Sequence, residues 1–473
     1  MSKSVFKSVF APSDMTVGTP WKSILTFTVP MIIGNIAQQL YNTVDSIVVG
    51  KYIGDNALAA VGSAGPLLNM LLVLFIGISA GAGIMVSQYF GARNREALSR
   101  SIGNVITVTA VCCLVLIAVM SWLIRPILVM LNTPESILDW CANYLLISLV
   151  GIAGLAYYNI LSGIIRGLGD SVSTLLYLLT ATAINIVLDI YFVAVLGLGV
   201  PGVALATVIA QMVSATLCLI KLSRMRNYFD FGLRYMIPKK DFVKTIVKLG
   251  LPSGLTQAIL SSAMIVVQSL TNQFGEQFIA ANVVIMRVDG FAMMPNFSFG
   301  MAMTTYAGQN VGAGLYDRVT KGAKQGTLMA VAVSATITGA ILLFGKGLMG
   351  IFTDTAELVE LSYRLMNILA VGYIAMAVWQ SLAGVMRGAG DTVSPMWISL
   401  ITTVAIRVPI AYGISYLTRT PELPIGRQEC IQISLLCSWV IGALLTFIFY
   451  RIGKWKTKAI TNQGKQNAPA AEA

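Results

Sequence analysis

Long apolar runs recur along the whole chain, and short polar segments separate them. A helix rises about 1.5 Å per residue, so about 20 apolar residues cover the hydrocarbon core of a bilayer, which is about 30 Å thick. Twelve runs reach this length, and the pattern therefore predicts an all-α membrane protein with twelve spanning helices. They lie near residues 22–48, 58–88, 101–124, 138–160, 172–195, 200–221, 243–269, 279–305, 322–346, 362–383, 394–416 and 430–450.

The chain contains two copies of one repeat. The sequence GIIRGLGDSVST begins at Gly163, and GVMRGAGDTVSP begins at Gly384, 221 residues later. QYFGAR from Gln88 and QNVGAG from Gln309 keep the same spacing. Self-similarity at a fixed spacing indicates a repeat architecture. Six spans fall in each copy, and an even number returns the chain to its starting side. We therefore expect two six-helix lobes related by a pseudo-twofold axis along the membrane normal.

Polar stretches set the expected domain boundaries. The longest one joins the two copies and predicts a cytoplasmic linker at residues 222–242. The C-terminal end is polar and alanine-rich and has little to bury, so we expect it to be disordered. The remaining boundaries follow from the spans. The expected segments are a cytoplasmic N-terminal segment at 1–20, a first lobe at 21–221, a second lobe at 243–452 and a cytoplasmic tail at 453–473.

Composition and charge agree with this picture. Hydrophobic residues make up 56% of the chain and charged residues 11%, unlike an ordinary soluble domain. Of the 32 basic residues, 24 flank one face of the predicted bundle and five flank the other. Lys and Arg accumulate on the cytoplasmic side, so both termini are expected in the cytoplasm and the net charge of +12 is a topology signal. We expect a multi-pass protein of the plasma (inner) membrane, surrounded by lipid, with no nucleic-acid partner.

The chain has no histidine, and its six cysteines lack CxxC spacing. Histidine is the commonest proton carrier and the commonest zinc ligand, so proton chemistry here must use carboxylates. No nucleophile or metal constellation is visible, which argues against an enzyme. We expect no bound cofactor beyond a transient proton or sodium ion.

Three acidic residues, Asp45, Asp189 and Asp289, fall within apolar runs. A carboxylate inside a bilayer costs at least about 2.5 kcal/mol, and such groups usually line a bundle interior. Asn185 and Asp189 are one helical turn apart and share a face. If the first, fifth and sixth spans converge, oxygen ligands surround one point that could hold a proton or a sodium ion. The alternative is that the acids are neutral packing groups. The expected cation site comprises Asp45, Asn185, Asp189 and Thr207.

Polar and soft side chains elsewhere suggest a substrate cavity. A polar stripe on the first span points inward, and a methionine-rich segment from Phe291 to Tyr306 offers adaptable apolar contacts. The alternatives are ordinary core packing and structural ion pairing, for example with Arg407. The candidate cavity residues are Gln38, Asn42, Gln257, Gln268, Arg287, Asp289 and Met293.

Each RGxGD copy ends in an aspartate, Asp170 or Asp391, just before a Ser/Thr-rich helix start. An acidic side chain at this position accepts hydrogen bonds from free backbone amides. We therefore expect a turn followed by a helix cap in both copies.

Several of these segments together resemble the multidrug and toxic compound extrusion (MATE) family of transporters. They are VPMIIGNIAQQLYNTVDSIVVGKYIG, SQYFGAR, AGQNVGAG, both RGxGD copies, NIVLDIYF and GVPGVALATVIAQ. The resemblance spans nearly the whole chain. It implies two six-helix lobes, alternating access by a rocker switch, and export of amphipathic, often cationic, organic compounds in exchange for protons or sodium ions.

The resemblance also has consequences for the site. One prokaryotic branch places its coupling cation in the first lobe, and the matching positions here are Asp45, Asn185, Asp189 and Thr207. Another branch carries coupling acids on the first and fourth spans of the second half, where this chain has none. A monomeric transporter of small organic molecules is the expected function. A lipid-linked saccharide flippase of the same superfamily is the main alternative, and an ion channel fits less well with internal repeats and buried acids.

Overall fold

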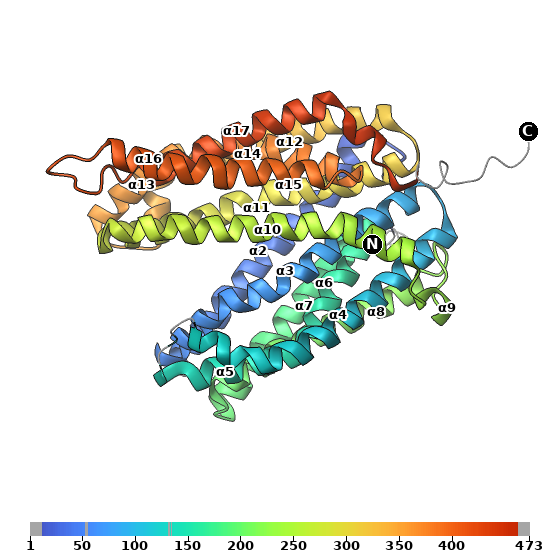
Figure 1. Ribbon diagram of the computed structural model, residues 1–473, viewed down its shortest axis with the longest axis horizontal. Coiled ribbons are helices and arrows are strands. Elements are labelled where there is room, and N and C mark those ends of the chain that lie inside the picture. Colours follow the sequence, from blue (N-terminus) through green and yellow to red (C-terminus); the bar gives the residue numbers. More distant parts are fainter. Residues whose placement is uncertain (1–11, 53–54, 131–132, 134, 462–473) are drawn as a thin grey trace, which may run out of the picture. The chain divides into compact units, whose positions relative to one another are not determined.

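The computed structural model describes residues 12–52, 55–130, 133 and 135–461, without the side chains of 41–52, 55–67, 69–70 and 136–137. The described residues form helices and one isolated bridge, between Thr420 and Leu423. Among them, ten helices are long and apolar enough to cross a membrane, and counting each of two bent helix pairs as one span gives twelve. The chain is therefore a multi-pass membrane protein, and the predicted fold class is confirmed (Figure 1).

The chain divides into two compact units. The first contains the described residues up to Asp14 together with Val29–Gly254, and the second contains Met15–Thr28 together with the described residues from Leu255 onward. The lobe and linker boundaries expected from the sequence stay a prediction. Most of the first unit is built from α2 (Pro20–Tyr52), α3 (Asp55–Gly91), α4 (Arg95–Met130), α5 (Glu135–Val150), α6 (Ile152–Gly167), α7 (Ser171–Asp189), the π-helix η1 (Ile190–Val195), α8 (Gly199–Arg224) and α9 (Leu233–Met236).

The second unit repeats this order. Its helices are α11 (Glu276–Gly312), α12 (Tyr316–Gly350), α13 (Ala356–Ala370), α14 (Gly372–Gly388), α15 (Val393–Leu400), the π-helix η2 (Ile401–Arg407), α16 (Val408–Leu417), α17 (Cys430–Ile452) and the 3-10 helix η3 (Lys454–Thr457). In both repeats the fifth span contains a π-helical segment, and the fourth span is bent, by 49° between α5 and α6 and by 43° between α13 and α14. The duplication predicted from sequence thus extends to the irregular parts of the fold.

Two helices contribute to both units. The first turns of α2 belong to the second unit and its remainder to the first, whereas α10 (Lys240–Gln273) begins in the first unit and ends in the second. A proline lies inside each helix close to this change, Pro30 in α2 and Pro252 in α10. Proline removes one backbone hydrogen bond from the helix, so each helix has a weak point at the change of unit.

Small residues bring α3 and α6 into backbone contact in the first unit. A Cβ atom added at Gly163 would lie 2.5 Å from Ser79 Oγ, and one at Gly167 would lie 2.8 Å from the carbonyl oxygen of Gly83. Ser79 and Gly83 are four residues apart on α3, and so are Gly163 and Gly167 on α6. The small residues therefore form one stripe along each helix. Such stripes let helices approach closely where lipid provides no hydrophobic driving force.

The second unit makes the same contacts 221 residues later. A Cβ at Gly384 would collide with the carbonyl oxygen of Gly300, and one at Gly388 with that of Thr304. These contacts join α14 to α11 (Figure 1). The first glycine of each RGxGD segment and the glycine four positions earlier therefore have a packing reason to be glycine.

The RGxGD aspartates cap helices, as predicted. Asp170 accepts hydrogen bonds from the N–H group of Ser173 at 2.9 Å and from its hydroxyl at 2.7 Å. Asp391 accepts the equivalent two bonds from Ser394, at 3.2 and 2.7 Å. The preceding glycines have φ values of +92° and +97°, a conformation that side chains disfavour. Asp170 also forms a buried ion pair with Lys221, at 3.0 Å.

The polar interval between the two repeats is packed against α4. The guanidinium of Arg95 binds the carboxylate of Asp230, at 2.7 Å, and donates to the carbonyl oxygens of Arg226 and Asn227. Asn104, fully buried, accepts from the backbone N–H of Lys239 at 2.6 Å. This linker is therefore held in place by side chains of α4.

Residues 15–18 are fixed to the second unit by Arg318. Its guanidinium donates to the carbonyl oxygens of Met15, Val17 and Gly18, at 3.2, 2.7 and 2.7 Å. Met15 is fully buried, and its backbone N–H donates to Gln309 Oε1 at 2.8 Å. Gln309 belongs to the QNVGAG segment, so this motif anchors the chain ahead of α2.

The expected disorder of residues 453–473 is wrong for its first part. Gly453 ends α17 in a left-handed conformation, and η3 follows at once. Trp455 is buried and stacks on Tyr450, with ring centroids 5.5 Å apart, and this contact holds the segment. Residues 462–473 lie outside the described residues.

Candidate functional site

Asn185 and Asp189 lie one turn apart on α7, and both are buried, with 1% and 0% of their surface exposed. In the amide orientation that satisfies both of its polar atoms, Asn185 Nδ2 donates to Asp189 Oδ2 at 2.9 Å. Its Oδ1 then accepts from the backbone N–H of Thr207 at 3.2 Å. The side-chain amide also lies 3.4 Å from the Thr207 hydroxyl oxygen. The predicted convergence of these three residues is confirmed.

The local backbone explains how α7 and α8 present these groups together. The α-helix gives way to the π-helix η1 directly after Asp189, and Gly197 and Gly199 then turn the chain with φ values of +64° and +60°. α8 returns alongside α7 and carries Thr207. π-helical turns are rare and frequently occur at functional sites.

A second polar side chain on α8 follows Thr207 by one turn. Gln211 has 7% of its surface exposed, and its Oε1 accepts no hydrogen bond from the described residues. The donor set around this part of α7 and α8 therefore consists of carboxylate, amide and hydroxyl oxygens. Hard oxygen ligands of this kind suit a proton or a sodium ion, and no cluster of three or more His, Cys, Asp or Glu residues that could hold a metal occurs in the described residues.

The contribution of the first span stays a prediction. Asn42 and Asp45 lie on the helical backbone of α2, but their side chains fall outside the described residues. Gln38 is described and half-buried on the same helix.

The second unit contains a separate acid, Asp289, which is half-buried. Asp289 on α11 accepts a hydrogen bond from the hydroxyl of Tyr373 on α14, at 2.8 Å. Tyr373 is fully buried. Arg407, the last residue of η2, is close enough for its charge to act on Asp289, although no direct ion pair joins them. Arg287, two residues before Asp289, is exposed, as expected for residues that do not share a helix face.

Sequence reasoning missed the partners of Asp289. Asn296 Nδ2 donates to the carbonyl oxygen of Tyr373 at 3.3 Å, and Asn296 Oδ1 accepts from the hydroxyl of Ser334 at 2.8 Å. Asn282 accepts from Gln432 at 3.4 Å. The signal that could have found this group is the spacing of Asn282, Asp289 and Asn296, which are seven residues apart and therefore share one face of α11.

The other candidate cavity residues lie in different surroundings. Gln257 and Gln268 are exposed on α10, and Gln268 donates to Asn272 at 2.8 Å. Met293 is buried in the second unit, with 7% of its surface exposed. Their grouping into one cavity stays a prediction.

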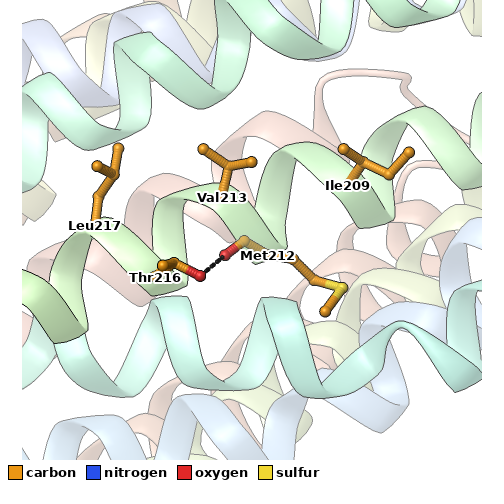
Figure 2. Close-up of a pocket in the computed structure, with 5 residues that line it drawn as sticks. All are labelled: Ile209, Met212, Val213, Thr216 and Leu217. Carbon is orange, nitrogen blue, oxygen red and sulfur yellow. Dashed lines mark hydrogen bonds between the residues drawn. The ribbon is translucent and has the colours of Figure 1, made fainter.

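A shallow apolar hollow on α8 is distinct from the cation site. Figure 2 shows the side chains that line it and the bond from the Thr216 hydroxyl to the Met212 carbonyl oxygen, 2.8 Å long. At about 100° per residue, this lining lies on the side of α8 away from Thr207 and Gln211. The hollow therefore provides no polar group to the site. Its lining residues are Ile209, Met212, Val213, Thr216 and Leu217.

The matches to known proteins extend over nearly the whole chain. The family model MatE matches twice, at residues 30–191 and 252–413. A probable multidrug resistance protein, YoeA of Bacillus subtilis (strain 168), is 28% identical over 93% of this chain and 95% of its own length. A probable multidrug resistance protein, NorM of Thermotoga maritima, is 24% identical over 97% of this chain and 98% of its own length.

Solved structures share the fold. The crystal structure of MATE in complex with MaL6 superposes with a TM-score of 0.87 at 24% identity, over 94% of this chain and 99% of that one. The outward-facing conformation of a multidrug resistance MATE family transporter gives the same score and coverage.

Proposed function

This chain belongs to the MatE family, and we propose that it is a secondary active antiporter that exports amphipathic, often cationic, organic compounds in exchange for protons or sodium ions. The curated relatives that carry the name multidrug resistance support the substrate class. The observation that carries the coupling is the contact of two buried side chains, Asn185 and Asp189, with Thr207.

The geometry suggests how the site binds its cation. A carboxylate inside a membrane is costly unless a cation neutralises it, so Asp189 binds a proton or a sodium ion. Asn185 bridges Asp189 and the backbone of Thr207, which fixes the position of α7 against α8. Binding of the cation therefore acts on two helices at once. Asp45 is the proposed second acid, and a pair of acids would titrate together.

The wider mechanism follows from the duplication. Two repeats with one orientation allow alternating access by a rocker switch, in which the coupling cation and the exported compound use different states. We infer that the transporter acts as a monomer in the plasma (inner) membrane, in contact with lipid, with both termini in the cytoplasm. It needs no cofactor beyond the transient cation, and it performs no covalent chemistry.

Uphill transport of tetraphenylphosphonium into proteoliposomes, under an imposed proton or sodium gradient, tests the proposal. Asp189→Asn and Asp45→Asn should each abolish gradient-driven flux. Asp139→Asn, an exposed acid of the first unit, should leave it unchanged. Unimpaired coupling in Asp189→Asn would overturn the site. No flux in the wild type under either gradient would overturn the antiporter, and translocation of a lipid-linked saccharide would then be measured.

A further inference from the structure

A polar network crosses the interior of the second unit, and the proposed coupling site does not use it. It runs from Asp289 through Tyr373 and Asn296 to Ser334, so three helices, α11, α14 and α12, contribute. Each link is a hydrogen bond between 2.8 and 3.3 Å. Buried polar networks are costly unless their groups are satisfied, so this one needs a reason.

Asp289 is the titratable end of the network. Its Oδ1 accepts from the Tyr373 hydroxyl, and no basic side chain of the described residues forms a direct ion pair with it. A tyrosine hydroxyl is a neutral donor, so it lowers the cost of the buried charge without removing it. Binding a proton is the remaining way for the carboxyl to become neutral.

Arg407 adds a distant positive charge. It lies at the end of η2, and its Nε is buried without a hydrogen-bond partner in the described chain. An arginine stays charged at any physiological pH, and no direct ion pair joins Arg407 to Asp289.

Several other charged groups of the helices that pack on α11 have partners of their own. Arg364 pairs with Glu429 at 3.2 Å, and Lys346 pairs with Glu360 at 2.6 Å. Glu357 accepts from Gln277 at 3.0 Å. Arg387 lies near Gly300, more than ten residues along α11 from Asp289.

The network also contacts the bend of the fourth span in the second repeat. Tyr373 is the second residue of α14, directly after the 43° break that separates it from α13. The Thr338 hydroxyl donates to the carbonyl oxygen of Ala370, the last residue of α13, at 2.7 Å. Asn296 satisfies the carbonyl of Tyr373 on the other side. Side chains of α11 and α12 thus hold both ends of the break.

We propose that Asp289 is a second proton-binding carboxyl, located in the second unit, with Tyr373 as its hydrogen-bond donor. It binds and releases one proton in each transport cycle, in addition to the cation at Asp189. This second statement rests on the proposed antiport. Because Tyr373 is the second residue of α14, a change in the protonation of Asp289 acts on the helix directly after the bend.

Infrared spectroscopy tests proton binding directly, in purified protein and without transport. A spectrum recorded across a pH series should show a protonated carboxyl C=O band that disappears as pH rises and that Asp289→Asn lacks. Tyr373→Phe should shift the frequency of this band, because the hydrogen bond to the carboxyl is lost. Asp354→Asn, an exposed acid of the second unit, and Asp189→Asn should both retain the Asp289 band.

A transport assay tests whether Asp289 takes part in the transport cycle. With the membrane potential clamped at zero, each coupled proton contributes about a factor of ten in substrate accumulation per pH unit of gradient. Asp289→Asn should therefore lower the limiting accumulation ratio about tenfold, and Asp354→Asn should not. If every carboxyl band of the wild type persists in Asp289→Asn, the proton site is overturned. An unchanged accumulation ratio overturns its use in the cycle. If the wild type shows no coupled flux, the proposed antiport is overturned. The infrared result then still shows whether Asp289 binds a proton.

Discussion

The amide of Asn185 donates to the carboxylate of Asp189 at 2.9 Å, and its own oxygen accepts from the backbone of Thr207. One side chain therefore joins the buried acid to the neighbouring helix. If Asp189 binds the coupling cation, Asn185 holds the carboxylate in the orientation that receives it.

Replacing Asn185 with alanine should change the proton affinity of Asp189 without abolishing transport. The amide donates to the charged carboxylate and stabilises its unprotonated form by about 1.5–3 kcal/mol, so for a coupling proton the half-saturating concentration should fall roughly ten- to hundredfold. The measurement is substrate flux against cation concentration in proteoliposomes. Thr180→Ala, an exposed position on the same helix, should leave the curve in place. An unchanged half-saturating concentration in Asn185→Ala would contradict the role of the amide.

Asp170→Ala should destabilise the protein more than Asp391→Ala. Both lose a helix cap, which costs about 1 kcal/mol. Only Asp170 also leaves a partner behind, because Lys221, with 15% of its side chain exposed, loses its ion pair. Breaking a buried pair costs about 3–5 kcal/mol. Thermal unfolding in detergent should show the larger loss for Asp170→Ala. Equal losses would indicate that Lys221 is solvated without its partner.

Gly384→Ala should lower the yield and the melting temperature. The added methyl group would meet the backbone carbonyl of Gly300, which cannot move aside as a side chain can. Overpacking costs about 1–3 kcal/mol, and we expect the upper end. Gly339→Ala is the matched change, since a Cβ there has no neighbour within 4 Å. Size-exclusion chromatography after heating measures the fraction of each variant that stays folded. Equal fractions for Gly384→Ala and Gly339→Ala would argue against a close contact of α14 with α11.

Protection of the linker should depend on pH through Asp230. The hydrogen bond from Arg95 holds the pKa of Asp230 below its usual value of 3.8. A carboxyl whose pKa is lower in the folded protein than in the unfolded protein stabilises the fold at any pH above the unfolded pKa. This stabilisation is lost as the pH falls through the folded pKa. Hydrogen exchange of residues 226–230 should therefore stay slow from neutral pH to about pH 5 and quicken below pH 3.8. Asp230→Asn should exchange fast at neutral pH, whereas Asp241→Asn, in the first turn of α10, should resemble the wild type.

Arg318→Ala should release residues 15–18. Three backbone carbonyls lose their charged donor; the bond to Met15 is half-buried, and the bonds to Val17 and Gly18 are exposed. A cysteine placed at Met15, which is fully buried, should become reactive to maleimide in this variant and stay unreactive beside intact Arg318. Lys321→Ala, exposed one turn further along α12, provides the control. Protection retained in Arg318→Ala would show that Gln309 alone holds the segment.

Much of this fold is predictable because the interactions that set it are local. Long apolar runs fix the spans, and an aspartate before Ser173 or Ser394 fixes a helix start. Asn185 and Asp189 are recognisable because four residues make one turn. Thr207 follows because a short turn returns the next helix alongside.

Other features depend on contacts far apart in the sequence. The runs at 138–160 and 362–383 read as single spans, whereas the helices bend near Gly151 and Val371. A Cβ at Gly151 would meet the side chain of Val208, so the partner helix decides that bend. Tyr373 within an apolar run reads as packing until α11 places Asp289 beside it. The π-helices after Asp189 and Leu400 leave no mark in the local sequence.

The four backbone contacts that recur 221 residues apart bear on how the two copies have diverged. Where one backbone touches another, both copies have kept small residues, because a larger one has no room. Elsewhere the copies differ, and the acids show it: the counterpart of Asp189 is Ile410, and that of Asp289 is Leu68. Each copy thus retains the shared backbone contacts and carries an ionisable group that the other copy lacks. Replacing either copy with the other would keep these contacts and lose one ionisable group.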